Sequence, residues 1–133
     1  MGSINYKDSF ITVAADCPAA TAEEPDKPGS IASVQYRLLK ERPPYTLTSD
    51  DLLFETEKKR KGLAGTDAER AAFFAKSQAC LRASPLPKRY GWGIHHDAEG
   101  KIALIAQGSE DYRRLAACKD VKVVPAMRNR KAR

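Results

Sequence analysis

A long run without acidic side chains holds the residues of this sequence best suited to binding an anion. No Asp or Glu occurs between Glu69 and Asp97. Arginine presents a planar fork of donors to a carboxylate or phosphate, and lysine acts as a compact positive charge. The cations are followed by an indole and by an imidazole, which titrates near neutral pH. We therefore expect a ligand-binding site at Arg82, Lys88, Arg89, Trp92 and His95, with the two arginines pointing into a shared cleft.

Two features of the backbone in this run favour such a site. Pro85 and Pro87 stiffen the connection, so less entropy is lost when a ligand is held. In the strand that follows, Gly91 and Gly93 would share one face and permit close approach to it. Either a docked helix or a ligand can fill that face.

Three classes of function fit these residues. The leading hypothesis is a binding module for a small anionic ligand or an acidic partner. An enzyme would use the same pocket with His95 as acid or base, and it would need a carboxylate or Cys80 within hydrogen-bond reach of that ring. A nucleic-acid binder would stack bases on Tyr90 and Trp92 while the basic C-terminal residues contact phosphates, and its affinity would fall steeply with salt.

Other kinds of site find less support. His95 and His96 are adjacent, so in a strand they point to opposite faces and do not readily bind one metal ion. The sequence has neither a Cys-x-x-Cys pair nor a phosphate-loop motif. We expect no metal site and no cofactor, and we expect Cys80 to be a small buried side chain rather than a nucleophile.

Composition predicts one ordinary globular domain over residues 1–133. Hydrophobic residues make up 42% and charged residues 30% of the 133 residues. No apolar stretch is long enough to span a bilayer, and no secretory signal is visible, so we expect no membrane partner. The three cysteines are widely spaced, which suits a reducing compartment, and we expect a cytoplasmic protein. The oligomeric state, the specific ligand and any reaction remain open.

The positive charge is concentrated near the C-terminus. The net charge is +6, and residues 119–133 hold six basic residues and one acid. Such a tail attracts nucleic acid or acidic partners, or simply keeps a chain end solvated. In residues 128–133 only Ala132 is apolar, so we expect this basic tail to contribute little to folding.

Caps, breakers and periodicity predict the elements that must position these residues. Ser30, Thr48, Thr66 and Ser109 occupy helix N-cap positions, and Gly62 a helix end. The segment 16–29 contains three prolines and no periodic apolar face, so it should form a surface loop. We predict helices over about 30–42, 48–61, 66–82 and 109–118, and strands over about 10–14, 90–96, 101–107 and 121–124.

This order of elements predicts an α+β fold with a small, mainly antiparallel sheet and helices packed mostly on one face. The two middle strands should form a hairpin with a three-residue loop between Asp97 and Lys101 and a bulge at Gly100. Because a slip of one residue exchanges the faces of a strand, this register decides which side chains are buried. It places Trp92, Ile94 and His96 on the core face with Ile102 and Leu104.

The segment Cys80–His95, with the sequence CLRASPLPKRYGWGIH, also carries a resemblance. With the shorter matches Asn5-Tyr6, Phe10-Ile11, Gln35-Tyr36, Pro44-Tyr45 and Ala126-Met-Arg128, the chain resembles an uncharacterised bacterial family, a domain of unknown function of about this length. The resemblance covers nearly the whole chain and implies one intact domain. It implies no mechanism and no catalytic residues.

Overall fold

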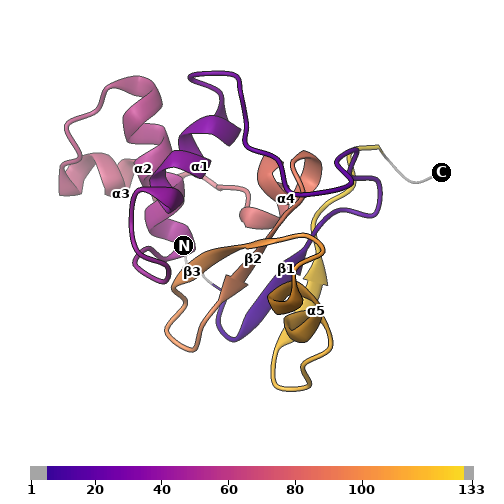
Figure 1. Cartoon of the computed structure of the whole chain (residues 1–133). Coiled ribbons are helices and arrows are strands. Elements are labelled where there is room, and N and C mark those ends of the chain that lie inside the picture. The colour runs from indigo at the N-terminus through magenta and orange to yellow at the C-terminus, as the bar shows by residue number, and fades with distance from the viewer. Residues whose placement is uncertain (1–5, 131–133) are drawn as a thin grey trace.

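A four-stranded sheet forms the centre of the computed structural model, which describes residues 6–130 (Figure 1). Its strand order is β3-β2-β1-β4. The hairpin partners β2 and β3 are antiparallel, β1 is antiparallel to β2, and β1 is parallel to β4. The α+β class and the mainly antiparallel sheet are thus confirmed. The strands are β1 (Ser9–Thr12), β2 (Trp92–His96), β3 (Ile102–Ala106) and β4 (Lys122–Pro125).

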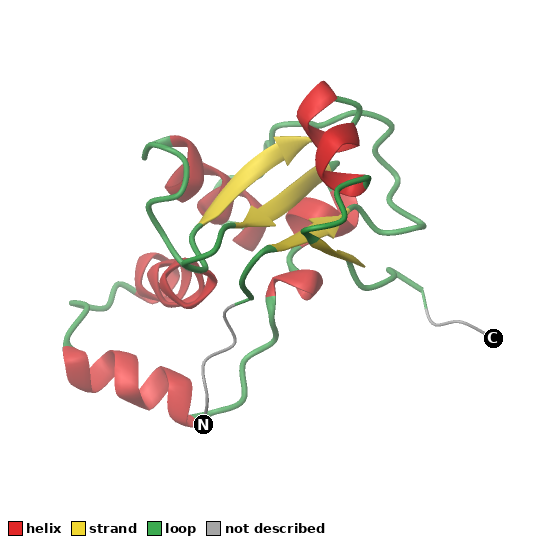
Figure 2. Cartoon of the chain, turned by 90° about the horizontal axis from the view of Figure 1, so that it is seen from below, coloured by secondary structure: helices red, strands yellow, loops and turns green. Residues whose placement is uncertain are grey.

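Most helices lie on one side of this sheet, and one helix covers the other side (Figures 1 and 2). Leu38, Leu52 and Leu81, which come from three of the helical elements, pack on Ile11 and Ile94 of the sheet. The final helix packs against the opposite face. The elements are α1 (Ile31–Lys40), α2 (Ser49–Lys61), α3 (Asp67–Ala75), the 3₁₀ turn η1 (Leu81–Ala83), α4 (Pro85–Arg89) and α5 (Glu110–Ala116).

The predicted helix starts are confirmed by their caps. The Ser30 hydroxyl accepts the Ser33 N–H at 3.2 Å, which satisfies a donor left open at the start of α1. Reciprocal capping boxes open α2 at Thr48 and α3 at Thr66. Gly62 ends α2 in the left-handed conformation, with φ of 68°.

The third helix is shorter than predicted, because α3 ends at Ala75 instead of continuing to about Arg82. The Gln78 side chain donates to the Phe73 carbonyl at 2.8 Å and satisfies one of the acceptors that a helix end leaves open. No residue of α3 is fully buried, so packing does not extend the helix further. The chain instead forms η1, and Ser84 then caps the short helix α4, which the sequence did not predict.

The hairpin register agrees with the prediction. Ile94 lies opposite Leu104, and His96 lies opposite Ile102. Ile94, His96 and Ile102 are fully buried on the face toward α1 and α2, as expected for the core side.

The opposite face of the hairpin is filled by a helix, which decides between the two expectations for Gly93. A Cβ at Gly93 would lie 2.7 Å from the Phe10 ring and 2.9 Å from the Tyr112 ring of α5. These two rings meet edge to face, and the Tyr112 hydroxyl accepts the Val13 N–H at 2.9 Å. The glycine therefore allows α5 to dock closely. Within residues 6–130, every helix is too short or too polar to cross a membrane.

Candidate functional site

The structure distributes the five predicted site residues over three neighbouring elements. Arg82 is on η1, Lys88 and Arg89 are on α4, and Trp92 and His95 are on β2. Because side chains alternate along a strand, Trp92 and His95 project from opposite faces of the sheet. The five side chains therefore do not line one pocket.

The C-terminal segment of residues 125–129 runs along η1 and α4, the elements that carry Arg82, Lys88 and Arg89. The Met127 N–H donates to the Arg82 carbonyl at 2.8 Å, and Arg82 Nε donates to the Pro125 carbonyl at 2.7 Å. Further along, the Asn129 side-chain amide donates to the Lys88 carbonyl at 2.8 Å. The basic residues of the motif and those of the C-terminal segment thus lie on the same side of the molecule.

Asp16 anchors this segment. Its two carboxylate oxygens accept the Asn129 N–H at 3.0 Å each, and one of them accepts the Arg130 N–H at 3.0 Å. The Asn129 side-chain amide adds a bond of 3.2 Å. These hydrogen bonds, above all that from the Asn129 backbone, lower the pKa of Asp16 from its ordinary value. The part of the tail that the structure describes therefore docks on the domain.

Docking of the tail creates an open hollow of about 430 Å³ that two arginines help to line. Within the described residues, the side chains of Arg89 and Arg130 make neither an ion pair nor a hydrogen bond. Arg82 is not part of the wall, because its guanidinium binds Pro125, so the two motif arginines do not share this hollow. We call it the tail hollow; its lining is Asp16, Pro18, Arg89, Asn129 and Arg130.

Trp92 is held in a separate aromatic contact. Its indole Nε1 donates to the Glu23 carbonyl at 2.8 Å, and its ring lies 5.6 Å from the Tyr36 ring of α1. The Lys40 ammonium lies 4.6 Å from the centre of the indole, within cation–π range. The ring and the polar edge of the indole thus have protein neighbours, which leaves it less available to stack on a nucleic-acid base.

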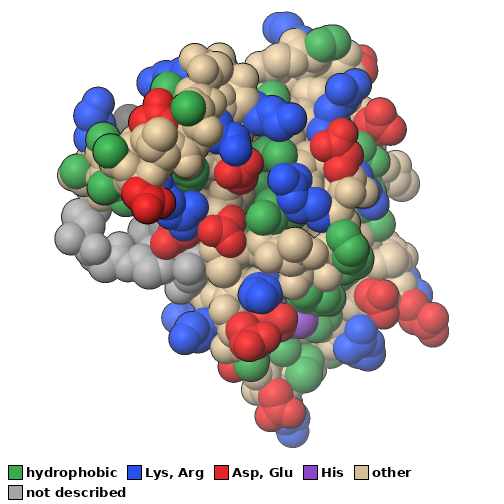
Figure 3. Space-filling model, turned by 90° about the vertical axis from the view of Figure 1, so that its left-hand side faces the viewer, with side chains coloured by type: hydrophobic (Ala, Val, Ile, Leu, Met, Phe, Trp, Pro, Cys, Tyr) green, Lys and Arg blue, Asp and Glu red, His purple; other side chains and the backbone are tan. Residues whose placement is uncertain are grey.

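His95 forms a pair with an unusual tyrosine. The Tyr45 hydroxyl lies 2.8 Å from His95 Nδ1, and the two rings meet edge to face. Burial lowers the pKa of His95, and nearby Arg114 lowers it further, while Asp97 opposes both. Among the described residues, the hydrogen bonds of this ring include neither a carboxylate nor a thiol. A histidine side chain is visible on the face shown in Figure 3, whereas His96 is fully buried.

The other histidine and Cys80 both contact Tyr6. Tyr6 places its ring edge-on to His96, with the centroids 5.4 Å apart, and its hydroxyl lies 3.3 Å from Cys80 Sγ. Both ring nitrogens of His96 are buried without a hydrogen-bond partner. Burial lowers the pKa of His96 to about 4, so the ring is neutral at pH 7. Across residues 6–130, no three His, Cys, Asp or Glu side chains are grouped closely enough to hold a metal ion.

Sequence reasoning missed Asp16 and Asn129, the two residues that build the tail hollow. Asp16 belongs to an irregular loop and Asn129 to a basic tail, and neither segment has a periodicity that indicates a contact. An Asp can bind backbone N–H groups of any distant segment, so residue type alone does not reveal the pairing. Tyr45 follows two prolines, and no local signal indicated its contact with His95.

Comparison with known proteins gives one match. A model described as a family of unknown function, DUF6157, matches residues 1–132. No curated protein and no solved structure matches the chain significantly.

Proposed function

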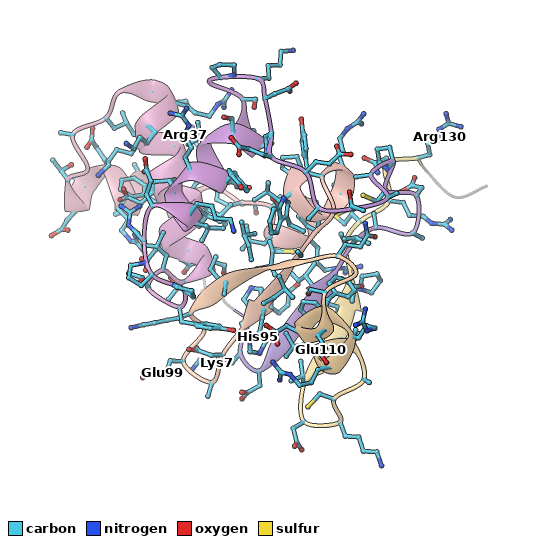
Figure 4. The ribbon with its side chains drawn as sticks, in the orientation of Figure 1. Lys7, Arg37, His95, Glu99, Glu110 and Arg130 are labelled. Atoms are coloured by element: carbon cyan, nitrogen blue, oxygen red, sulfur yellow. The ribbon has the colours of Figure 1, made fainter. Side chains whose placement is uncertain are left out.

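Since the chain belongs to the family of unknown function DUF6157, we propose from its geometry that the domain is a binding module for a small anionic ligand or an acidic partner, held at the tail hollow. The observation that carries this proposal is the convergence of Arg89 and Arg130 on one hollow. Figure 4 shows Arg130 on the C-terminal segment, well apart from His95, so the proposed site does not include the histidine.

The charges around the tail hollow favour an anion over a cation. Its one carboxylate, Asp16, already accepts hydrogen bonds at both oxygens, which leaves little capacity for a further donor. The two arginines keep all their donors available, and planar forks of this kind suit carboxylates and phosphates. Arg82 binds the Pro125 carbonyl and the Lys88 carbonyl accepts from Asn129, so both basic residues contact the segment that forms the hollow and add to the positive charge of this region.

A titration with two probes tests this proposal. Inorganic phosphate and citrate are titrated into the intact protein at low salt and followed by calorimetry. We expect binding that the double variant Arg89→Ala/Arg130→Ala weakens at least tenfold, and that the matched variant Arg60→Ala/Arg114→Ala, which removes the same charge elsewhere, leaves within twofold. Equal losses in both variants would reduce the effect to net charge and contradict a site at the tail hollow.

A second candidate, acid–base catalysis at His95, is favoured by one observation. Tyr45 has φ of 63°, a left-handed conformation that is rare for an aromatic residue and that often marks a functional site. Burial also raises the pKa of its hydroxyl, so the phenol keeps its proton beside the His95 ring. Among the described residues, the ring bonds neither a carboxylate nor the Cys80 thiol, one of which the sequence-based hypothesis requires, and we therefore rank this candidate below anion binding.

A further inference from the structure

Strand β3 lies at an edge of the sheet, on the side of the molecule that Figure 3 faces. The direction of its backbone groups follows from the register. The Asp97 N–H donates to the Lys101 carbonyl at 2.9 Å, and the Gln107 N–H donates to the Gly91 carbonyl at 3.0 Å. In an antiparallel ladder such pairs alternate with pairs that do not bond each other. Ile102, Leu104 and Ala106 therefore direct their N–H and C=O groups away from β2, toward the open edge.

The protein covers only part of this edge. The Ile102 N–H donates to the Leu47 carbonyl at 2.8 Å, and the Ile102 carbonyl accepts the Tyr45 N–H at 3.0 Å. The Ala106 carbonyl accepts the Ser109 N–H at 3.1 Å. Within the described residues, this leaves both backbone groups of Leu104 and the N–H of Ala106 without a protein partner.

Residues 45–47, which cover the edge at Ile102, turn away from β3 before they reach Leu104. Tyr45, with φ of 63°, cannot continue an extended strand, and the two residues before it are Pro43 and Pro44, which have no N–H to donate. The chain's own segment therefore stops pairing just before Leu104. The free groups are in an extended conformation, which is the geometry that accepts a further strand.

An apolar groove of about 250 Å³ runs beside these free groups, between the end of α1, the 43–47 segment and β3. We call it the edge groove; its lining includes Leu38, Pro43, Leu47 and Leu104, with Lys40 and Arg42 at its rim. None of the ion pairs found among the described residues involves Lys40 or Arg42. Lys40 lies over the Trp92 ring, and Arg42 donates to the Leu38 carbonyl at 3.1 Å.

We propose that the β3 edge and the edge groove bind an extended, acidic peptide segment of a partner protein, which adds a strand to the sheet beside Leu104. Backbone hydrogen bonds to Leu104 and Ala106 supply sequence-independent affinity, and the groove receives an apolar side chain. Lys40 and Arg42 select acidic residues. A second copy of this chain fits less well, because pairing two β3 edges would bring four cations together in a protein whose net charge is +6.

A labelled peptide tests this proposal. The probe is a fluorescein-labelled hexapeptide of alternating aspartate and valine, and binding is followed by anisotropy and by amide hydrogen exchange. We expect saturable binding that protects the Leu104 and Ala106 amides. The same peptide with lysine in place of aspartate, or N-methylated at its valines, should bind at least tenfold more weakly. Binding of all three peptides with equal affinity, or no binding at all, would overturn the proposal.

Three variants locate the contact. Charge reversal by Lys40→Glu/Arg42→Glu should weaken binding at least tenfold, while Lys76→Glu/Lys61→Glu, an equal charge change at the C-terminal ends of α3 and α2, should leave it within threefold. Ala106→Pro removes an outward N–H and leaves the bonds to β2 in place, so it should reduce affinity without lowering the melting temperature by more than a few degrees. Unchanged affinity in the first and third variants, or concentration-dependent dimerisation through Leu104, would contradict an acidic strand as the occupant.

Discussion

The hydroxyl of Tyr45 lies 2.8 Å from Nδ1 of His95 even though the Tyr45 backbone is left-handed. Strained backbone persists when surrounding contacts fix it. Here the Tyr45 N–H is held by the Ile102 carbonyl and its hydroxyl by His95, so the residue is fixed at both ends.

We expect this pair to keep the His95 pKa below the ordinary value, chiefly through burial. Tyr45→Ala should expose the ring and raise the His95 pKa, and Arg114→Ala should also raise it by removing a neighbouring positive charge. Asp97→Asn should lower it. NMR titration of the imidazole C–H resonances measures the His95 pKa in the unaltered protein and in the three variants. A His95 pKa that none of these substitutions moves would show that the ring is solvated.

His96 should make stability depend on pH. Its pKa is about 4 in the folded protein, below the ordinary value near 6.5, so the unfolded chain binds the proton more readily. The contribution of the neutral His96 ring to the free energy of unfolding is therefore fully present above about pH 6.5, and it is lost as the pH falls toward 4.

Replacing His96 tests whether this residue causes the loss of stability in acid. His96→Leu removes two buried nitrogens that lack partners, so we expect it to stabilise the protein at pH 7 by about 1–3 kcal/mol and to flatten the acid slope. Urea unfolding at pH 5 and pH 7 provides the measurement. An unchanged slope in His96→Leu would mean that other groups cause the loss.

Gly93→Ala should destabilise the fold by about 1–3 kcal/mol, because the added methyl meets two aromatic rings. Chemical denaturation measures the loss. In the control Phe10→Leu/Gly93→Ala the smaller side chain makes room, so the two changes should cost less together than their sum. Strict additivity would contradict a steric origin.

Asn129→Ala should release the described part of the tail. It removes two side-chain hydrogen bonds and should cost about 1 kcal/mol and expose the Arg130 amide to faster hydrogen exchange. Docking should also weaken as the pH falls through the lowered pKa of Asp16, because the protonated carboxyl loses its attraction for the N–H groups. Arg128→Ala, on the same exposed segment, serves as the control and should leave that exchange rate unchanged.

The parts of the fold that the sequence predicted are those governed by local physical chemistry. The caps at Ser30, Thr48 and Thr66 and the turn at Gly100 depend on neighbouring residues, and the hairpin register followed from the turn. The predicted end of α3 was wrong. Apolar residues continue at helical spacing past Ala75, but no buried surface supports a longer helix there.

The candidate site was less predictable for a related reason. Arg89 was recognised by its type and by the absence of acids around it, but its partner Arg130 depends on a contact between Asp16 and Asn129. That contact joins two irregular segments through backbone N–H groups, which every sequence possesses. Only the folded chain determines which of these groups a carboxylate meets.

The position of β1 has a consequence for the order of folding. Ser9 pairs with His96 on one side and with Lys122 on the other, so both neighbours of this inner strand come from the distant part of the chain. Closing such long loops is entropically costly, whereas β2 and β3 are joined by a short turn. We expect the hairpin to form first and the insertion of β1 to limit the folding rate. Until then β2 exposes an unpaired edge, which makes the partly folded chain the state most prone to aggregation.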